Sequence, residues 1–218
     1  MRTRIKFCGI TRPDDARRAA DLGVDAVGFV FTRASRRFVG ITQAREIRAA
    51  LPPFVSVVAL FMDDEPGWIE DVVSAVAPDL LQFHGGEPDG FASIFSRPYV
   101  KAVPMASVSD VARHIAAYPG AAGFLLDSHA RGGQGGTGAP FDWSKVPPAN
   151  GRAFVLAGGL TAGNVADAIA SVRPFGVDVS TGIESAPGIK DAAKMRAFVA
   201  AVRGADAAQV ARDRSART

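Results

Sequence analysis

Eight short apolar runs recur along the chain, and each is followed by a longer polar or amphipathic segment. The runs are rich in β-branched and aromatic side chains, which is typical of strands buried on both faces of a parallel sheet. Helical spacing of apolar residues in most intervening segments predicts that helices connect these strands. The predicted strands lie at residues 5–8, 25–31, 54–61, 80–83, 99–103, 122–126, 153–156 and 176–179. The predicted helices lie at residues 14–22, 42–51, 66–76, 88–95, 110–117, 164–172 and 189–203.

This alternation favours an α/β fold of the (β/α)₈ TIM-barrel type, with a parallel eight-stranded barrel. The length of 218 residues is close to the ~250 residues usual for such barrels. A doubly wound open sheet is the competing architecture, but it needs neither such even recurrence nor a polar residue after every strand. No break in composition interrupts the pattern, so we predict a single catalytic domain over residues 1–203. Residues 204–218 are polar and rich in alanine, and we expect a flexible, frayed C-terminal extension there.

Composition excludes several classes of function. The single cysteine excludes an intrachain disulfide framework and a multi-cysteine metal site. The net charge is +3, but the basic residues are dispersed and no basic run is interleaved with aromatic residues, which argues against nucleic-acid binding. No apolar run is long enough to cross a membrane, and no signal-peptide core follows the first residues. We therefore expect a cytoplasmic protein without a membrane partner.

The lone cysteine, Cys8, lies at the end of the first predicted strand. Gly9 allows a tight turn after it, and Pro13 is typical of the start of a helix. In a barrel, the carboxyl ends of the strands form the active face, where a thiol could move a proton or attack a substrate. The alternative is that Cys8 is a small buried hydrophobe of the core.

Further polar residues follow other strands. Asp127 ends an apolar strand, where it is either a cap for the next loop or a general acid held partly out of water. Arg37 is either a ligand for an anionic group, which guanidinium binds in a bidentate manner, or a solvated loop residue. His84 either contacts the substrate or supports a hydrogen-bonded turn.

The loops after the seventh and eighth strands predict a phosphate site, because barrels commonly hold phosphate there. Backbone N–H groups in these loops lead toward helix N-termini, which favour anions. The residues assigned to this site are Gly158, Gly159, Ser180, Thr181 and Gly182. The glycine-rich segment 132–138 lacks the lysine of a P-loop, so we interpret it as a mobile flap. A thiol, a carboxyl group and a phosphate site around one barrel mouth predict proton transfer on a phosphosugar substrate.

Specific motifs recur along the chain from residue 5 to about residue 202. They are KFCGIT at 6–11, GFVF at 28–31, SRRFV at 35–39, QFHG at 82–85, LLD at 125–127, GGTG at 135–138, FDW at 141–143, LAGGL at 156–160, GVDVSTGIE at 176–184 and GIKD at 188–191. With these motifs in the expected order, the chain closely resembles the phosphoribosylanthranilate isomerase family, barrel enzymes of tryptophan biosynthesis. The departures are Phe83, where the family usually has an aliphatic residue, and Arg36, where it often has proline.

The resemblance implies an Amadori rearrangement of N-(5-phosphoribosyl)anthranilate to 1-(2-carboxyphenylamino)-1-deoxyribulose 5-phosphate. By analogy, Asp127 protonates the ring oxygen as the ring opens, and the Cys8 thiolate removes the proton at the sugar C2. Arg37 would hold the anthranilate carboxylate, and His84 and Asp178 are assigned to substrate binding with it. Either Lys6 or the cationic intermediate would lower the thiol pKa. No metal and no organic cofactor is expected, and the protein is expected to be a monomer or a homodimer.

Three alternatives stay open from the residues. A ProFAR isomerase would share the phosphate end but usually uses paired aspartates, and Cys8 stands in place of one of them. A ribulose-phosphate epimerase usually uses metal-binding histidines, and this chain has three histidines in all. A catalytically silent phosphate-binding module would not need both Cys8 and Asp127.

Overall fold

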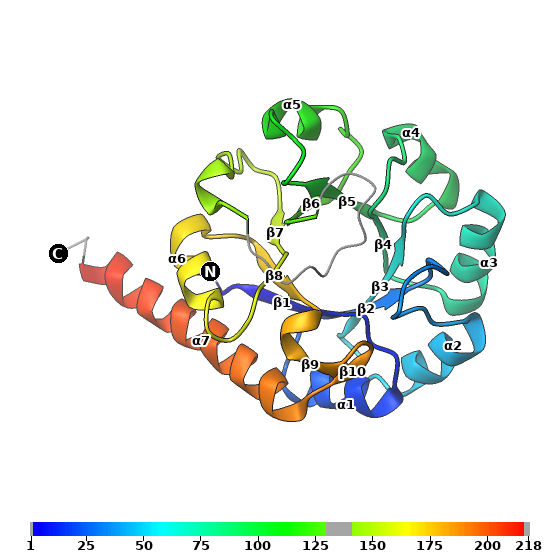
Figure 1. Ribbon diagram of the computed structural model, residues 1–218, viewed down its shortest axis with the longest axis horizontal. Coiled ribbons are helices and arrows are strands. Elements are labelled where there is room, and N and C mark those ends of the chain that lie inside the picture. Colours follow the sequence, from blue (N-terminus) through cyan, green and yellow to red (C-terminus); the bar gives the residue numbers. More distant parts are fainter. Residues whose placement is uncertain (1, 130–140, 216–218) are drawn as a thin grey trace.

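The computed structural model describes residues 2–129 and 141–215, which form a closed barrel of eight parallel strands surrounded by helices (Figure 1). Each strand pairs with the next along the chain, and β1 pairs with β8 to close the barrel. This closure confirms the predicted (β/α)₈ barrel, since the first and last strands of an open sheet would not pair. The strands are β1 Arg4–Cys8, β2 Ala26–Val30, β3 Ser56–Phe61, β4 Leu80–Phe83, β5 Tyr99–Pro104, β6 Gly123–Asp127, β7 Phe154–Leu156 and β8 Gly176–Val179.

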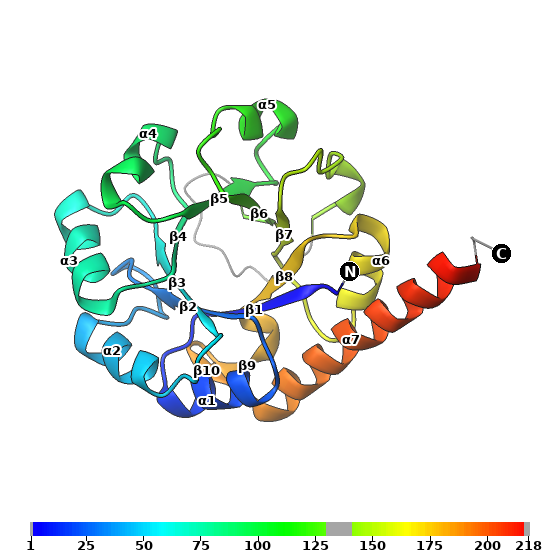
Figure 2. The same cartoon turned by 180° about the vertical axis from the view of Figure 1, so that it is seen from behind.

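Helices or short helical turns follow the strands and cover the outside of the barrel (Figures 1 and 2). The segment predicted as one helix over 88–95 divides into a short α-helix and a 3₁₀ turn. The glycine-rich segment 132–138, which we predict to be a flap, lies outside the described residues. The helices are α1 Pro13–Asp21, α2 Ile41–Ala49, α3 Pro66–Val76, α4 Asp89–Ala92, α5 Val111–Ala116, α6 Val165–Val172 and α7 Ala192–Ser215, and the 3₁₀ turns are η1 Ser93–Phe95, η2 Trp143–Lys145 and η3 Thr181–Ile183.

Side chains alternate along each strand, so one set packs against the helices and the other faces the barrel interior. On β1, Ile5 and Phe7 belong to the main hydrophobic core, whereas Cys8 lines a cavity at the barrel mouth. On β6, Leu126 belongs to the same core and Asp127 lines the same cavity. The alternation of side chains packs Phe7 and Leu126 against the helices. It therefore also points the next residue of each strand, Cys8 or Asp127, into the barrel mouth.

The last helix differs from the sequence prediction at both ends. Ile189–Lys190 forms β10, which pairs with β9 (Glu184–Ala186) in a small antiparallel sheet, so α7 begins only at Ala192. The helix then continues to Ser215, and its final turns extend past the barrel (Figures 1 and 2).

The predicted helix end at residue 203 and the frayed extension after it are therefore wrong for residues 204–215. Alanine has the highest helix propensity, and the stretch after Gly204 is rich in it. The Asp206 carboxylate also accepts hydrogen bonds from the backbone N–H and the hydroxyl group of Thr3, at 3.0 and 2.6 Å. The domain boundary predicted at residue 203 consequently falls inside a continuous helix. No helix within residues 2–129 and 141–215 is long and apolar enough to cross a membrane.

Candidate active site

Two adjoining cavities open where the strands of the barrel end. The first, of about 610 Å³, is lined by the residues predicted to carry the chemistry and bind the substrate, which are Cys8, Arg37, His84, Asp127 and Asp178. The second, of about 510 Å³, is lined by the residues predicted to bind phosphate, which are Gly158, Gly159, Ser180, Thr181 and Gly182. Both cavities share the two carboxylates and the Ser180–Thr181 pair. The structure therefore brings every site residue predicted from the sequence to one mouth.

A buried ion pair lies beneath Cys8. The register across the seam between β1 and β8 places Lys6 opposite Asp178, and Lys6 Nζ donates to Asp178 Oδ1 at 2.9 Å. Both side chains are buried, at 11% and 8% exposure. Burial alone would lower the pKa of Lys6, but the charges of Asp178 and of the Cys8 thiolate outweigh it and raise that pKa. Lys6 is therefore a permanent cation in the barrel interior.

Gly28 on β2 makes room for Lys6 beside the thiol. The register between β1 and β2 pairs Cys8 with Gly28. A Cβ atom at residue 28 would lie 2.9 Å from Lys6 Nζ and 3.0 Å from Cys8 Sγ. Both distances are at or below the closest approach that real Cβ atoms make, so a larger residue here would push the ammonium and the thiol apart. This close approach explains the need for glycine in the middle of a strand.

The thiol itself experiences opposing influences. Burial, together with the negative charge of Asp178, raises the pKa of Cys8 above its ordinary value, and the positive charges of Lys6 and Lys190 offset this only in part. Lys190 Nζ donates to the backbone carbonyl of Cys8 at 2.6 Å, so the second ammonium is held just behind the residue. Cys8 is thus a mostly protonated thiol near two ammonium groups. A further positive charge close to it would lower its pKa and increase the fraction of thiolate.

Arg37 reaches the mouth from the loop after β2 and is clamped by Glu184. The Arg37 Nε and Nη2 atoms donate to the two oxygens of the Glu184 carboxylate at 2.8 and 2.6 Å, and Lys190 Nζ donates to the same carboxylate at 2.8 Å. Burial alone would raise the pKa of Glu184, but the two cations outweigh it and lower that pKa. Gly9, with φ +70°, permits this path, because a Cβ there would overlap the Arg37 side chain. The clamp fixes the direction of the guanidinium.

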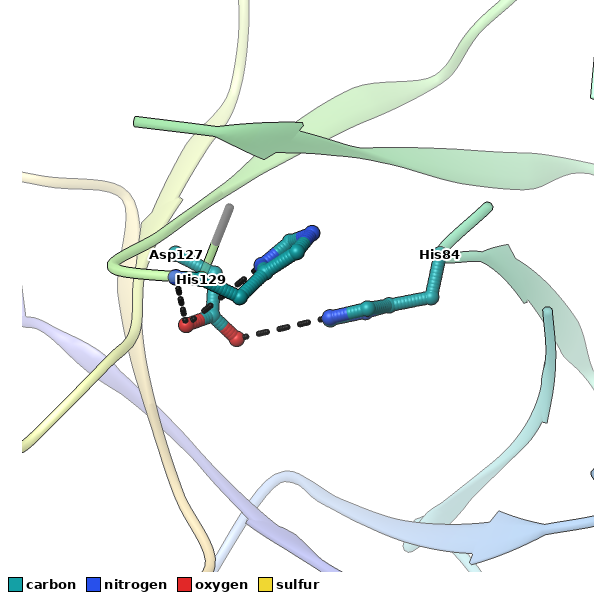
Figure 3. A group of neighbouring side chains, drawn as sticks. All are labelled: His84, Asp127 and His129. Atoms are coloured by element: carbon teal, nitrogen blue, oxygen red, sulfur yellow. Dashed lines mark hydrogen bonds and ion pairs between the residues drawn. The ribbon is translucent and has the colours of Figure 1, made fainter. Parts of the chain in front are cut away.

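Asp127 lies in a different setting, beside the two stacked imidazole rings of His84 and His129 (Figure 3). Its Oδ2 atom is 3.6 Å from His84 Nε2, and its Oδ1 atom is 3.7 Å from His129 Nδ1. The backbone N–H of His129 donates to Oδ1 at 3.3 Å, and the two imidazole rings stack with centroids 4.2 Å apart. Burial alone would raise the pKa of Asp127, but the two histidines lower it.

His84 is neutral at ordinary pH. Burial lowers the pKa of His84 to about 4, and the neighbouring Asp127 charge offsets this only in part. Gln82 on β4 lies beside the ring, with Nε2 3.3 Å from His84 Nδ1. With that amide orientation the imidazole carries its proton on Nε2, on the side of Asp127. His84 therefore lines the cavity beside the Asp127 carboxylate, and its contact with the substrate stays a prediction.

The predicted phosphate end is built from backbone and small side chains. Gly158 and Gly159, with φ values of +79° and +64°, turn the chain directly after β7. Lys194 is the cationic side chain among the residues lining the second cavity, and its Nζ donates to the backbone carbonyl of Glu184 at 2.7 Å. Backbone N–H groups and one ammonium next to a concave surface suit a phosphate monoester.

The sequence assigns no role to three residues near this mouth, and it gives a fourth, Lys6, only as one of two options. The three are Glu184, Lys190 and His129. Lys6 is one of two groups that the sequence analysis names as lowering the thiol pKa. Its place between apolar residues of an alternating strand indicates that it points into the barrel with Cys8. Glu184 and Lys190 occur within matched motifs, but nothing in those motifs indicates that they hold Arg37. His129 had no signal, because it reaches Asp127 only through a turn that brings its own backbone N–H to that carboxylate.

Comparisons with known proteins identify the family of this chain. The family model described as N-(5'-phosphoribosyl)anthranilate (PRA) isomerase matches residues 5–201. The N-(5'-phosphoribosyl)anthranilate isomerase of Xanthomonas campestris pv. campestris (strain 8004) is 56% identical over 212 residues, which cover 94% of this chain and 95% of the relative.

Solved structures give the same result. The crystal structure of phosphoribosyl anthranilate isomerase from Thermotoga maritima superposes with a TM-score of 0.84 at 39% identity, covering 93% of this chain and 99% of that one. A second, solved in complex with reduced 1-(o-carboxyphenylamino)-1-deoxyribulose 5-phosphate, has a TM-score of 0.79 at 39% identity and the same coverage. The family match runs from β1 into α7, and on this evidence the chain belongs to the N-(5'-phosphoribosyl)anthranilate isomerase family.

Proposed function

We propose that Asp127 and Cys8 carry the two proton transfers of the reaction that defines this family. That reaction is the Amadori rearrangement of N-(5'-phosphoribosyl)anthranilate to 1-(2-carboxyphenylamino)-1-deoxyribulose 5-phosphate in L-tryptophan biosynthesis, and this chain is an isomerase of that kind. The observation that carries the assignment is the single cavity lined by both the thiol and the carboxyl group. Both groups end barrel strands, so rigid elements hold them at the mouth.

Asp127 acts first, as the general acid. Its proton goes to the furanose ring oxygen, the C1–O bond breaks, and the nitrogen lone pair forms the C1=N bond of an iminium ion. In the protein without substrate the pKa of Asp127 is lowered. The carboxyl group is therefore a strong acid, but only a small fraction of it is protonated. Asp127 also lines the cavity assigned to phosphate, so the negative charge of a bound phosphate would raise its pKa and increase the protonated fraction.

Cys8 acts second, as the general base. The iminium ion withdraws electrons from C2, and the thiolate removes the C2 proton to leave a neutral enolamine. The enolamine takes up a proton at C1 and its C2 hydroxyl becomes the ketone, which completes the rearrangement without any change of oxidation state overall. Lys6 and Lys190 favour the thiolate, and the cationic intermediate adds to their effect at the moment when the base is needed.

The two ends of the substrate are held by different chemistry. The Glu184 clamp uses the Nε and Nη2 atoms of Arg37, and neither of those bonds involves Nη1. We assign the free side of this guanidinium to the anthranilate carboxylate, with His84 and Asp178 as further substrate contacts. The phosphate goes to the backbone around Gly158 and Gly159. The analogue bound in the related structure carries both a carboxylate and a phosphate, which supports two separate anion sites.

The experiment is a turnover assay with matched variants. Adding the protein to freshly prepared phosphoribosylanthranilate should cause its fluorescence to disappear as product forms. The variant Asp127→Asn should lose about 10²–10⁴-fold in kcat, the usual contribution of a general acid, while the control Asp14→Asn on exposed α1 should match the wild type. Circular dichroism confirms that both variants fold. A near-normal kcat in folded Asp127→Asn would remove this carboxyl group from the mechanism.

We also propose that the protein works on this phosphosugar in the cytoplasm as a monomer or a homodimer, without a nucleic-acid partner. The dispersed basic residues support the last point. Light scattering should give a mass of one or two chains of 22.7 kDa. A larger assembly, or retention on a nucleic-acid column at moderate salt, would contradict the corresponding part of the proposal.

A further inference from the structure

Three ligating atoms converge at the acid end of the mouth (Figure 3). They belong to His84, Asp127 and His129, and all lie within 4.8 Å of one another. His84 Nε2 lies 3.6 Å from one carboxylate oxygen, Oδ2, and His129 Nδ1 lies 3.7 Å from the other, Oδ1. Ligand atoms around a tetrahedral zinc ion lie about 3.3 Å apart, because Zn–N and Zn–O bonds are close to 2.0 Å. Small side-chain movements would bring these atoms to coordinating positions.

The two imidazole nitrogens in this cluster are buried and make no hydrogen bond to a described atom. His84 Nε2 and His129 Nδ1 both point toward the carboxylate, but at distances too long for a hydrogen bond. The two side chains are only 8% and 2% exposed. Buried polar atoms without partners are uncommon and destabilising. Because these two nitrogens face the same point, a ligand bound there would satisfy both.

Gln82 supplies the outer contact that a metal-binding histidine needs. Its Nε2 atom faces His84 Nδ1, while its buried Oε1 atom has no hydrogen-bond partner among the described residues. Turning the amide over would let Oε1 accept from a protonated Nδ1 and would leave the Nε2 lone pair of His84 facing the carboxylate. Ligating histidines usually donate their second N–H in this way, which fixes the tautomer that binds the metal.

We propose that His84, Asp127 and His129 form a binding site for a zinc-type divalent cation, and that the bound cation inhibits the isomerase. Two imidazoles and one carboxylate suit zinc, and the fourth position would face the cavity. The cation holds Asp127 in its ionised form, so the carboxyl has no proton to give. Binding is independent of the proposed mechanism, whereas inhibition rests on the proposed role of Asp127.

The first test is calorimetric titration of Zn²⁺ into chelator-treated full-length protein. We expect one site, and we expect His129→Phe to weaken it by more than about 10–100-fold, since even the loss of an outer contact costs that much. Phenylalanine preserves the ring that stacks on His84 but removes the ligand. The control His114→Ala removes the one histidine outside the cluster, and Cys8→Ser removes the thiol, and both should bind like the wild type. Equal binding by His129→Phe, or loss of binding in Cys8→Ser, overturns the proposal.

The second test measures Zn²⁺ binding in a variant that keeps all three ligands, in case His129→Phe does not fold. Gln82→Glu replaces the amide with a stronger acceptor for His84 Nδ1, so it should bind Zn²⁺ about tenfold more tightly. Unchanged or weaker binding in the folded variant counts against the site. Co²⁺ in the wild type should give visible absorption without a thiolate charge-transfer band, and a strong band of that kind would contradict the assignment of the ligands.

Inhibition is measured separately in the turnover assay. Zn²⁺ at concentrations that fill the site should abolish fluorescence loss, and excess chelator should restore it. Binding without inhibition would uphold the metal site but would count against Asp127 as the general acid, so the two failures are distinguishable.

Discussion

The two sides of the barrel mouth surround the groups that we propose as base and acid, Cys8 and Asp127, with opposite electrostatics. On the Cys8 side, charges of opposite sign are paired at close range, with Lys6 on Asp178 at 2.9 Å and Glu184 between Arg37 and Lys190. On the Asp127 side, within the part of the chain that the structure describes, the carboxylate faces two imidazole nitrogens at 3.6 and 3.7 Å and accepts one hydrogen bond from a backbone N–H. The Cys8 side is a network of paired charges, whereas on the other side imidazole rings and a backbone N–H surround one carboxylate.

The difference fits the roles that we propose for the two groups. A thiol needs nearby positive charge to become a base, and paired ions keep that charge in place at modest net cost. A carboxyl group that must donate a proton would be disabled by a close cation, because such a cation holds it ionised. The neutral His84 beside Asp127 adds no such fixed charge, whereas a lysine in its place would.

The largest expected effect comes from removing the proposed base, Cys8. Cys8→Ser preserves the shape but raises the pKa of the side chain far above neutral, so kcat should fall by about 10²–10⁴-fold, as for loss of other proton-transfer groups. KM should change little, because the interaction is made only in the transition state. Steady-state kinetics by the fluorescence assay measure both. Normal turnover in Cys8→Ser would make the thiol a packing residue and would leave the charged side without a catalytic purpose.

The second effect concerns the stability of the charged side. Lys6→Met leaves Asp178 buried without its partner, which should lower the free energy of unfolding by about 3–5 kcal/mol. The double variant Lys6→Met with Asp178→Leu should recover much of this loss, because no charge then remains unpaired. Urea denaturation of the single and double variants tests the coupling. A double variant whose loss equals the sum of the two single losses would show that the ions do not depend on each other.

A smaller effect is expected at the edge of the charge network. Arg37→Ala should raise KM by roughly 10–100-fold, the equivalent of a lost hydrogen bond to a charged group, while binding of inorganic phosphate stays near that of the wild type. Arg37→Lys should not restore KM, since an ammonium cannot reproduce the bidentate contact. The control Arg45→Ala changes an exposed arginine on α2. Equal weakening of both ligands would show that the two anion sites are assigned wrongly.

The same contrast explains what could be predicted from the sequence. The strands, and Cys8 and Asp127 at their ends, follow from local alternation, which the closed barrel preserves. The Lys6–Asp178 pair joins residues 172 positions apart, and only the β1–β8 register brings them together. The continuation of α7 depends on a similar long-range contact between Thr3 and Asp206. Contacts of this kind depend on tertiary geometry, and no local pattern encodes them.

The division of labour between the two sides can be tested most directly with substrate deuterated at the sugar C2. If Asp127 opens the ring and Cys8 then removes the C2 proton, cleavage of the C2–H bond should limit turnover in Cys8→Ser, and ring opening should limit it in Asp127→Asn. The primary isotope effect on kcat should therefore be large in Cys8→Ser and should approach unity in Asp127→Asn. Equal isotope effects in the two variants, or a larger one in Asp127→Asn, would contradict the assignment of acid and base.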